Sequence, residues 1–100
     1  NVAGGMKISE PAADLAVAAA LLSAREDVAL PPETVVFGEI SLSGALRPVS
    51  QTELRLKEAQ KLGFSSAIAP AGGKTGESGG MTLNQMGDLT AFVGDVFGAG

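Results

Sequence analysis

The strongest constraint on the fold of this chain is a predicted helix that begins with a proline. The segment SEPAADLAVAAALLSA, residues 9–24, predicts a helix whose first position is Pro11. Glu10 precedes that proline and is pushed out of the α region, so Glu10 or Ser9 is expected to cap the helix. Apolar residues continue around the back, so the helix is expected to be buried on more than one side. They are Leu15, Val17, Ala18, Ala19, Ala20, Leu21 and Leu22.

Strand and helix patterns follow in turn. Pro31 and Pro32 break the chain before TVVFGEISL (34–42), an apolar run that predicts a central strand, and a Ser-Gly turn leads from it into ALRPV (45–49) as a hairpin. FSSAIAP (64–70) predicts another strand. A last helix is predicted after Asp88, its cap, by apolar residues at i, i+3, i+4, i+7 and i+8. These are Leu89, Phe92, Val93, Val96 and Phe97.

The middle helix carries two start signals and one stop signal. Ser50 and Glu53 fit a capping box, and Val49 with Leu54 fits the hydrophobic staple that accompanies such boxes. Gly63 is the expected stop. The segment AGGKTGESGG, residues 71–80, is expected to be a mobile surface loop. Its GGKT does not fit a phosphate-binding loop, because Ile68 stands where that motif needs a glycine.

Composition excludes several kinds of site. The 100 residues contain no cysteine and no histidine, which removes disulfides, thiolate metal sites and the usual general base at neutral pH. Seven basic residues stand against eleven acidic ones, a net charge of −4, and no tyrosine or tryptophan is present to stack on bases. An autonomous DNA-binding module is therefore disfavoured. The apolar runs are too short to span a membrane, and a reducing, cytoplasmic setting fits.

Two charged residues interrupt apolar patterns. Glu39 lies within a strand pattern, and its burial would be costly without a basic or backbone partner. Arg55 falls inside the apolar arc of its helix, where it either lays its stem on the core and pairs with Glu58 or faces a neighbouring subunit. Clustering of the basic residues on one face would favour an interface or DNA contacts. These residues are Arg47, Arg55, Lys57 and Lys61.

Two long stretches carry a family resemblance. They are NVAGGMKISEPAADLAVAAALLS and GEISLSGALRPVSQTELRLKEAQKLGF. They resemble the proteolytic domain of Lon-type proteases and, more closely, the C-terminal Lon-like domain of the RadA (Sms) family of bacterial DNA repair proteins. The likeness is strong from Asn1 to about Pro70 and weak beyond. It implies a two-layer α/β (α+β) domain of the ribosomal protein S5 domain 2 type. Residues 1–100 would then form a single domain that lacks its earlier strands and a helix.

The resemblance also implies what the first turn of each helix would hold in an active relative. Lon-type proteases place a nucleophilic serine after a proline in the first turn of one helix and a lysine base in the first turn of the next. The corresponding residues here are Ala12 and Glu53. A serine–lysine dyad needs a hydroxyl and an amine that takes its proton, so no hydrolysis follows by that route.

The family implies a supporting role for this chain. It is expected to be an inactive scaffold and oligomerisation domain of a recombination ATPase. The full-length protein is expected to assemble as a ring, and more exactly a hexamer, around single-stranded DNA. Branch processing together with a recombinase is its expected task. ATP, magnesium and zinc are expected in other parts of the full-length protein, and no cofactor, metal or membrane partner is expected for this chain. An auxiliary DNA-binding module and a Lon-type peptidase with a displaced site remain as alternatives.

Overall fold

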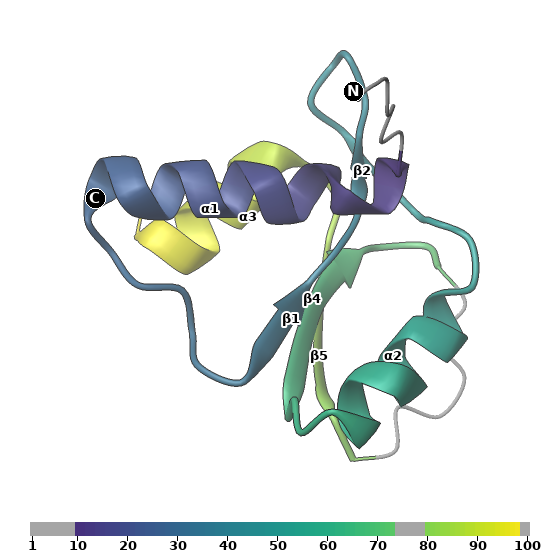
Figure 1. Ribbon diagram of the computed structural model, residues 1–100. Coiled ribbons are helices and arrows are strands. Elements are labelled where there is room, and N and C mark those ends of the chain that lie inside the picture. Colours follow the sequence, from purple (N-terminus) through teal and green to yellow (C-terminus); the bar gives the residue numbers. More distant parts are fainter. Residues whose placement is uncertain (1–9, 74–79, 99–100) are drawn as a thin grey trace, which may run out of the picture.

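The computed structural model describes residues 10–73 and 80–98 (Figure 1). A 3₁₀ turn, η1 (Pro11–Ala13), leads directly into helix α1 (Asp14–Glu26). The strands are β1 (Thr34–Val36), β2 (Glu39–Ile40), β3 (Leu46–Arg47), β4 (Ser66–Pro70) and β5 (Thr82–Met86). The remaining helices are α2 (Thr52–Lys61) and α3 (Leu89–Phe97). Most of the loop predicted at 71–80 lies outside the described residues.

The strands form two separate sheets. Strands β1, β4 and β5 make a parallel sheet with β4 in the middle, and β2 pairs with β3 as the predicted antiparallel hairpin. The prediction of one central strand over 34–42 is wrong, because the run divides at Phe37–Gly38 into β1 and β2. Within the described residues β1 is an edge strand, and the middle position belongs to β4.

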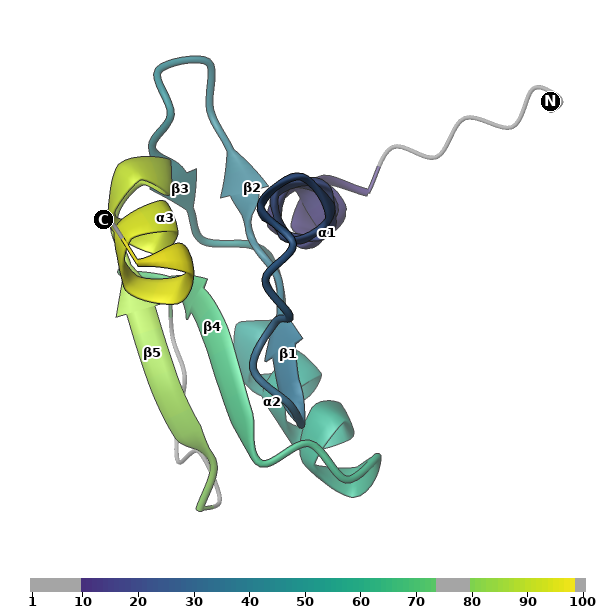
Figure 2. The same ribbon diagram turned by 90° about the vertical axis from the view of Figure 1, so that its left-hand side faces the viewer.

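Apolar side chains cover both faces of β4, so the described elements form three layers rather than the expected two. Ala67 and Ala69 pack in a cluster with Leu56 of α2. Ile68, which points the other way, packs in a cluster with Leu15 of α1 and with the fully buried Phe92 of α3. Figure 2 shows α2 and α3 on opposite sides of the sheet. A parallel sheet with two apolar faces needs cover on both of them.

The 3₁₀ turn that leads into α1 begins at Pro11, the predicted first position, and α1 is buried on one side only. Glu10 takes the N-cap position, but its side chain makes no capping hydrogen bond, and Ser9 lies outside the described residues. Glu10 is extended at the position before Pro11, and the helix ends two residues beyond the expected Ala24. Leu15 is fully buried, but Val17 and Leu21 are 56% and 67% exposed. The expectation of burial on more than one side is therefore wrong among the described residues, since none of their elements covers the outer side of this helix.

Helix α2 lacks the predicted capping box. Gln51 takes the N-cap position with a left-handed φ of 59°, no side chain accepts a capping hydrogen bond, and Ser50 lies one residue too early. The Thr52 hydroxyl instead donates to the Val49 carbonyl at 3.0 Å. The stop at Gly63 is confirmed. Its N–H donates to Gln60 and the next N–H donates to Ala59, the paired bonds of a Schellman motif.

The last helix is confirmed with its cap. The Asp88 carboxylate accepts a hydrogen bond from the Ala91 N–H at 2.8 Å, and the Phe92 ring meets the Phe97 ring edge to face at 6.0 Å between centroids. Strand β5 was not predicted. Its sequence, TLNQM, has one buried residue, Met86, and no alternation that would reveal a strand.

A single glycine joins α1 to the sheet. The Gly38 N–H donates to the Ala12 carbonyl at 2.9 Å, and the Gly38 carbonyl accepts from the Leu15 N–H at 2.9 Å. A Cβ at this position would lie 2.8 Å from Cγ of Pro70, and the φ of 155° disfavours any other residue. Gly38 is therefore required where the helix start meets the sheet.

We predict that Gly38→Ala lowers the free energy of unfolding by about 2 kcal/mol, because the added methyl group overpacks the contact with Pro70. Gly87→Ala is the matched control, since a Cβ there meets no atom within 4 Å, and its effect should stay within about 0.5 kcal/mol. Urea denaturation measures both variants. Equal midpoints for the two would contradict the close approach at Gly38.

Candidate functional site

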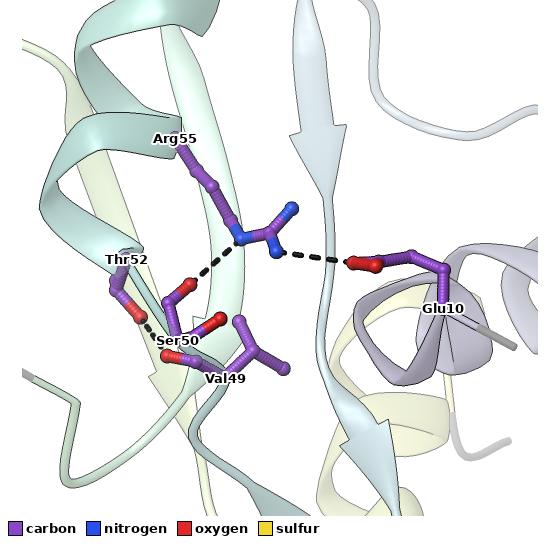
Figure 3. Close-up of polar contacts among 5 residues, drawn as sticks. All are labelled: Glu10, Val49, Ser50, Thr52 and Arg55. Atoms are coloured by element: carbon purple, nitrogen blue, oxygen red, sulfur yellow. Dashed lines mark hydrogen bonds and ion pairs between the residues drawn. The ribbon is translucent and has the colours of Figure 1, made fainter.

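An ion pair brings the starts of the first two helices together. Nη2 of Arg55 donates to Oε1 of Glu10 at 3.1 Å, and Nε of the same arginine donates to the Ser50 carbonyl at 2.9 Å (Figure 3). The Arg55 side chain is 33% exposed and that of Glu10 is 51% exposed. Pairing of Arg55 with Glu58 was expected and is wrong. Glu58 pairs with Lys61 at 3.6 Å instead.

The two positions singled out by the family resemblance lie beside this ion pair in sequence. Ala12 follows Glu10 by two residues, and Glu53 precedes Arg55 by two. Ala12 is 4% exposed and offers only a methyl group. The Glu53 side chain is 48% exposed and pairs with Lys57 at 3.5 Å, one helical turn further on. Neither residue supplies a hydroxyl or an amine, so this pair of side chains does not make up a serine–lysine dyad.

A second carboxylate at the start of α1, that of Asp14, joins the helix to strand β2. Oδ2 of Asp14 accepts a hydrogen bond from the Ile40 N–H at 3.0 Å and so fixes the helix to β2. Together with the two bonds of Gly38, this contact joins the first turn of the helix to the segment 38–40. Sequence reasoning missed Glu10, Asp14 and Gly38 as a connected group. A glycine within a strand pattern is the one available signal for such a close backbone approach.

The four basic residues do not share one open surface among the described elements. Lys57 and Lys61 lie one turn apart on α2, and each pairs with a carboxylate of the same helix. Arg55 turns toward Glu10. Arg47 lies on the hairpin, opposite Glu39 in the strand register. That register brings the basic partner expected for Glu39 alongside it, but no ion pair is found between the two side chains.

Within residues 10–73 and 80–98, no group of three or more histidine, cysteine, aspartate or glutamate side chains could hold a metal ion. No helix in the same residues is both long and apolar enough to cross a membrane. What the described part of the chain does present is a set of polar contacts that joins the starts of α1 and α2.

Comparison with known proteins places the chain in a family. Residues 1–73 match the family model for subunit ChlI of Mg-chelatase, and the chain belongs to that family. Among individual proteins it is similar to the DNA repair protein RadA of Brucella abortus, with 67% identity over 72 residues that make up 72% of this chain and 15% of the relative.

Two longer matches agree with this one. The chain is 48% identical over 93 residues to DNA repair protein RadA of Synechocystis sp., covering 93% of the chain and 18% of the relative. It is 41% identical over 97 residues to that of Treponema pallidum, covering 97% of the chain and 21% of the relative. The resemblance to the RadA family is confirmed, and the similarity reaches beyond Pro70. The chain spans about a fifth or less of the length of these relatives.

We predict a small but measurable coupling between Glu10 and Arg55. Arg55→Ala should lower the free energy of unfolding by about 1 kcal/mol, because it removes the ion pair and the bond to the Ser50 carbonyl. Glu10→Gln should cost about 0.5 kcal/mol, and the double-mutant cycle should give a coupling below about 1 kcal/mol, since the pair is partly exposed. Chemical denaturation measures all three.

The control for this cycle is the pair Glu53 and Lys57, which joins neighbouring turns of one helix rather than two elements. Its coupling should be about 0.3 kcal/mol. Zero coupling between Glu10 and Arg55 alongside a normal value for the control pair would show that the ion pair does not join the helix starts in solution.

Proposed function

We propose that this chain is a catalytically inactive Lon protease-like domain, of the ribosomal protein S5 domain 2 type, that works as a scaffold in a RadA-type DNA repair protein. The observation that carries the proposal is the composition of the two helix starts. Where a Lon-type protease would need a serine and a lysine, this chain has a buried methyl at Ala12 and an ion-paired carboxylate at Glu53. The carboxylates of Glu10 and Asp14 on either side of Ala12 are bound to Arg55 and to the Ile40 N–H.

A scaffold needs surfaces that meet other protein, and the exposed apolar residues supply them. The large apolar side chains exposed in the described residues are Val17, Leu21, Val28, Leu42, Leu54 and Leu62. Several lie on the outer sides of α1 and α2, which are packed against opposite faces of the sheet. Apolar surface left open in this way favours protein contacts. We propose that the principal partner is another copy of the protein, assembled as a ring that is expected to be a hexamer.

The alternative of an auxiliary DNA-binding module has less support. The net charge is −4, and three of the four basic candidates already have a carboxylate partner. Binding to a nucleic acid depends on free cations that neutralise phosphates. In the proposed assembly, single-stranded DNA and a recombinase are partners of the full-length protein. ATP turnover and the binding of magnesium and zinc belong to other parts of the full-length protein. The full-length protein acts in the cytoplasm in this proposal.

We predict that Ala12→Ser restores no peptidase activity. The new hydroxyl would have no amine beside it to take its proton, because the expected base position holds Glu53, whose carboxylate already pairs with Lys57. Casein cleavage by the variant should equal that of the unaltered protein, and a serine-reactive phosphonate should leave residue 12 unlabelled. Labelling at residue 12 would revive the peptidase with a displaced site.

Assembly is the direct test of the scaffold. We predict that the full-length protein forms a closed oligomer by light scattering and that deletion of residues 10–98 lowers the number of copies per assembly, which is the measured mass divided by the mass of one copy, at equal concentration. Binding to single-stranded DNA is measured in parallel over a range of salt concentrations. If the deletion leaves the number of copies per assembly unchanged and instead removes a steeply salt-dependent binding to DNA, the DNA-binding module replaces the scaffold.

A further inference from the structure

A polar hollow of about 470 Å³ lies beside the last turn of α3, over the first residues of β1, β4 and β5. Figure 2 shows α3 near the ends of β4 and β5 to which the arrows point, and the beginnings of these strands extend beyond it. The polar side chains that line the hollow are Thr34, Ser65, Ser66, Thr82, Asn84 and Asp95. Hydroxyl, amide and carboxylate groups thus surround it, and no basic side chain of the described residues lines it.

Three of the hydroxyl groups form one row across the sheet. The register pairs Thr34 with Ser66 and Ser66 with Thr82. The Thr34 hydroxyl donates its only proton to the Pro32 carbonyl at 3.0 Å, so the Ser66 hydroxyl, at 2.6 Å, donates to the Thr34 oxygen. Oγ of Ser66 therefore has lone pairs, and no proton, left for a ligand.

The end of α3 makes the electrostatic potential at the hollow negative. Asp95 lies in the last turn of this helix, and that turn has no basic side chain. A helix carries its negative end at its C-terminus, where a cation is stabilised and a carboxylate is not. Asp95 forms no ion pair with any described residue. A carboxylate left unpaired at the negative end of a helix favours a positively charged ligand.

We propose that the hollow binds an ammonium group carried on an alkyl stem, the chemistry shared by a lysine side chain and a small diamine. An ammonium group has three protons to donate and accepts none, which matches the Asp95 carboxylate and the lone pairs of Ser66. Ile68 and Val96 also line the hollow and offer apolar surface to the methylene groups of the stem. The proposal is independent of the scaffold function, because no residue of α1 or α2 lines the hollow.

Carbodiimide coupling of diaminobutane to the full-length protein tests the site at a single residue. The reagent joins the amine to carboxylates as amides, and mass spectrometry measures the labelled fraction of each carboxylate. An amine bound in the hollow reacts with Asp95 in proportion to its occupancy, so labelling there should saturate, with a midpoint on the order of 1–10 mM for one exposed charge. Asp27 is the internal control. It is exposed outside the hollow, and its labelling should rise without that saturation.

The hydroxyl row is tested with Thr82→Val, which removes one hydroxyl and keeps the shape of the side chain. Loss of an acceptor for a charged donor should raise the midpoint at Asp95 about threefold to tenfold. Thr90→Val is the matched control, because Thr90 is also exposed and lies outside the hollow, and it should leave the midpoint unchanged. Equal midpoints in the two variants would show that the row takes no part, and the proposed site would be wrong.

Coupling without added diamine, in a mixture of isotopically labelled and unlabelled copies, identifies the source of the ammonium group. A link from Asp95 to a lysine of another copy, lost when diaminobutane is added, would assign the hollow to protein lysine side chains. Saturable labelling by the diamine without such a link would assign it to small diamines. Labelling of Asp95 that rises in parallel with that of Asp27 overturns the proposal. A link from Asp95 to a lysine of the same copy also overturns it, because the chain itself would then fill the hollow.

Discussion

The backbone bonds of Gly38 to the first turn of the first helix are the contact on which the rest of the structure depends. One N–H and one carbonyl of a single residue hold Ala12 and Leu15, and the absent side chain leaves room for Pro70. The same residue divides the apolar run 34–42, so that β1 stays in the parallel sheet while β2 turns away into the hairpin. The position of α1 and the direction of the hairpin thus have one common origin.

The chemistry of the junction follows from this packing. Ala12 is buried, and its carbonyl accepts a hydrogen bond from the Gly38 N–H. Glu10 and Asp14, the charged residues on either side of it, are bound to Arg55 and to the Ile40 N–H. A side chain that acts on a substrate needs polar atoms that are free to change partners. Among the described residues, the two carboxylates that flank position 12 in sequence are bound to Arg55 and to the Ile40 N–H, contacts that hold two helices and a hairpin in place.

Sequence patterns predicted those features whose cause is local. Asp88 caps α3 and Gly63 ends α2 because the capping atoms lie within a few residues of each other. The capping box at Ser50 failed because Gln51 adopts a left-handed conformation that moves the helix start by one residue, and nothing in the local pattern indicates this. The partner of Arg55 is Glu10, 45 residues away, so only the folded chain reveals it.

The same distinction applies to the candidate site and to strand order. The family resemblance identified Ala12 and Glu53, but the groups that connect them, Gly38 and the ion pair, depend on long-range contacts. The sequence pattern did not predict strand β5, because its side chains are mostly exposed and its position is set by pairing with β4. The pattern at 34–42 showed an apolar strand but not that β4 would take the middle of the sheet.

A junction without catalytic groups still has a physical use in the proposed scaffold. Helices α1 and α2 cover opposite faces of the sheet, and each leaves apolar side chains open on its outer side. A ring closes only if the two contact surfaces of each copy keep a fixed angle, because small errors add from one copy to the next. Gly38 and the pair Glu10–Arg55 fix the start of one helix to the start of the other. A fixed link between the two helix starts therefore suits the proposed scaffold, which must hold two docking surfaces at a constant orientation.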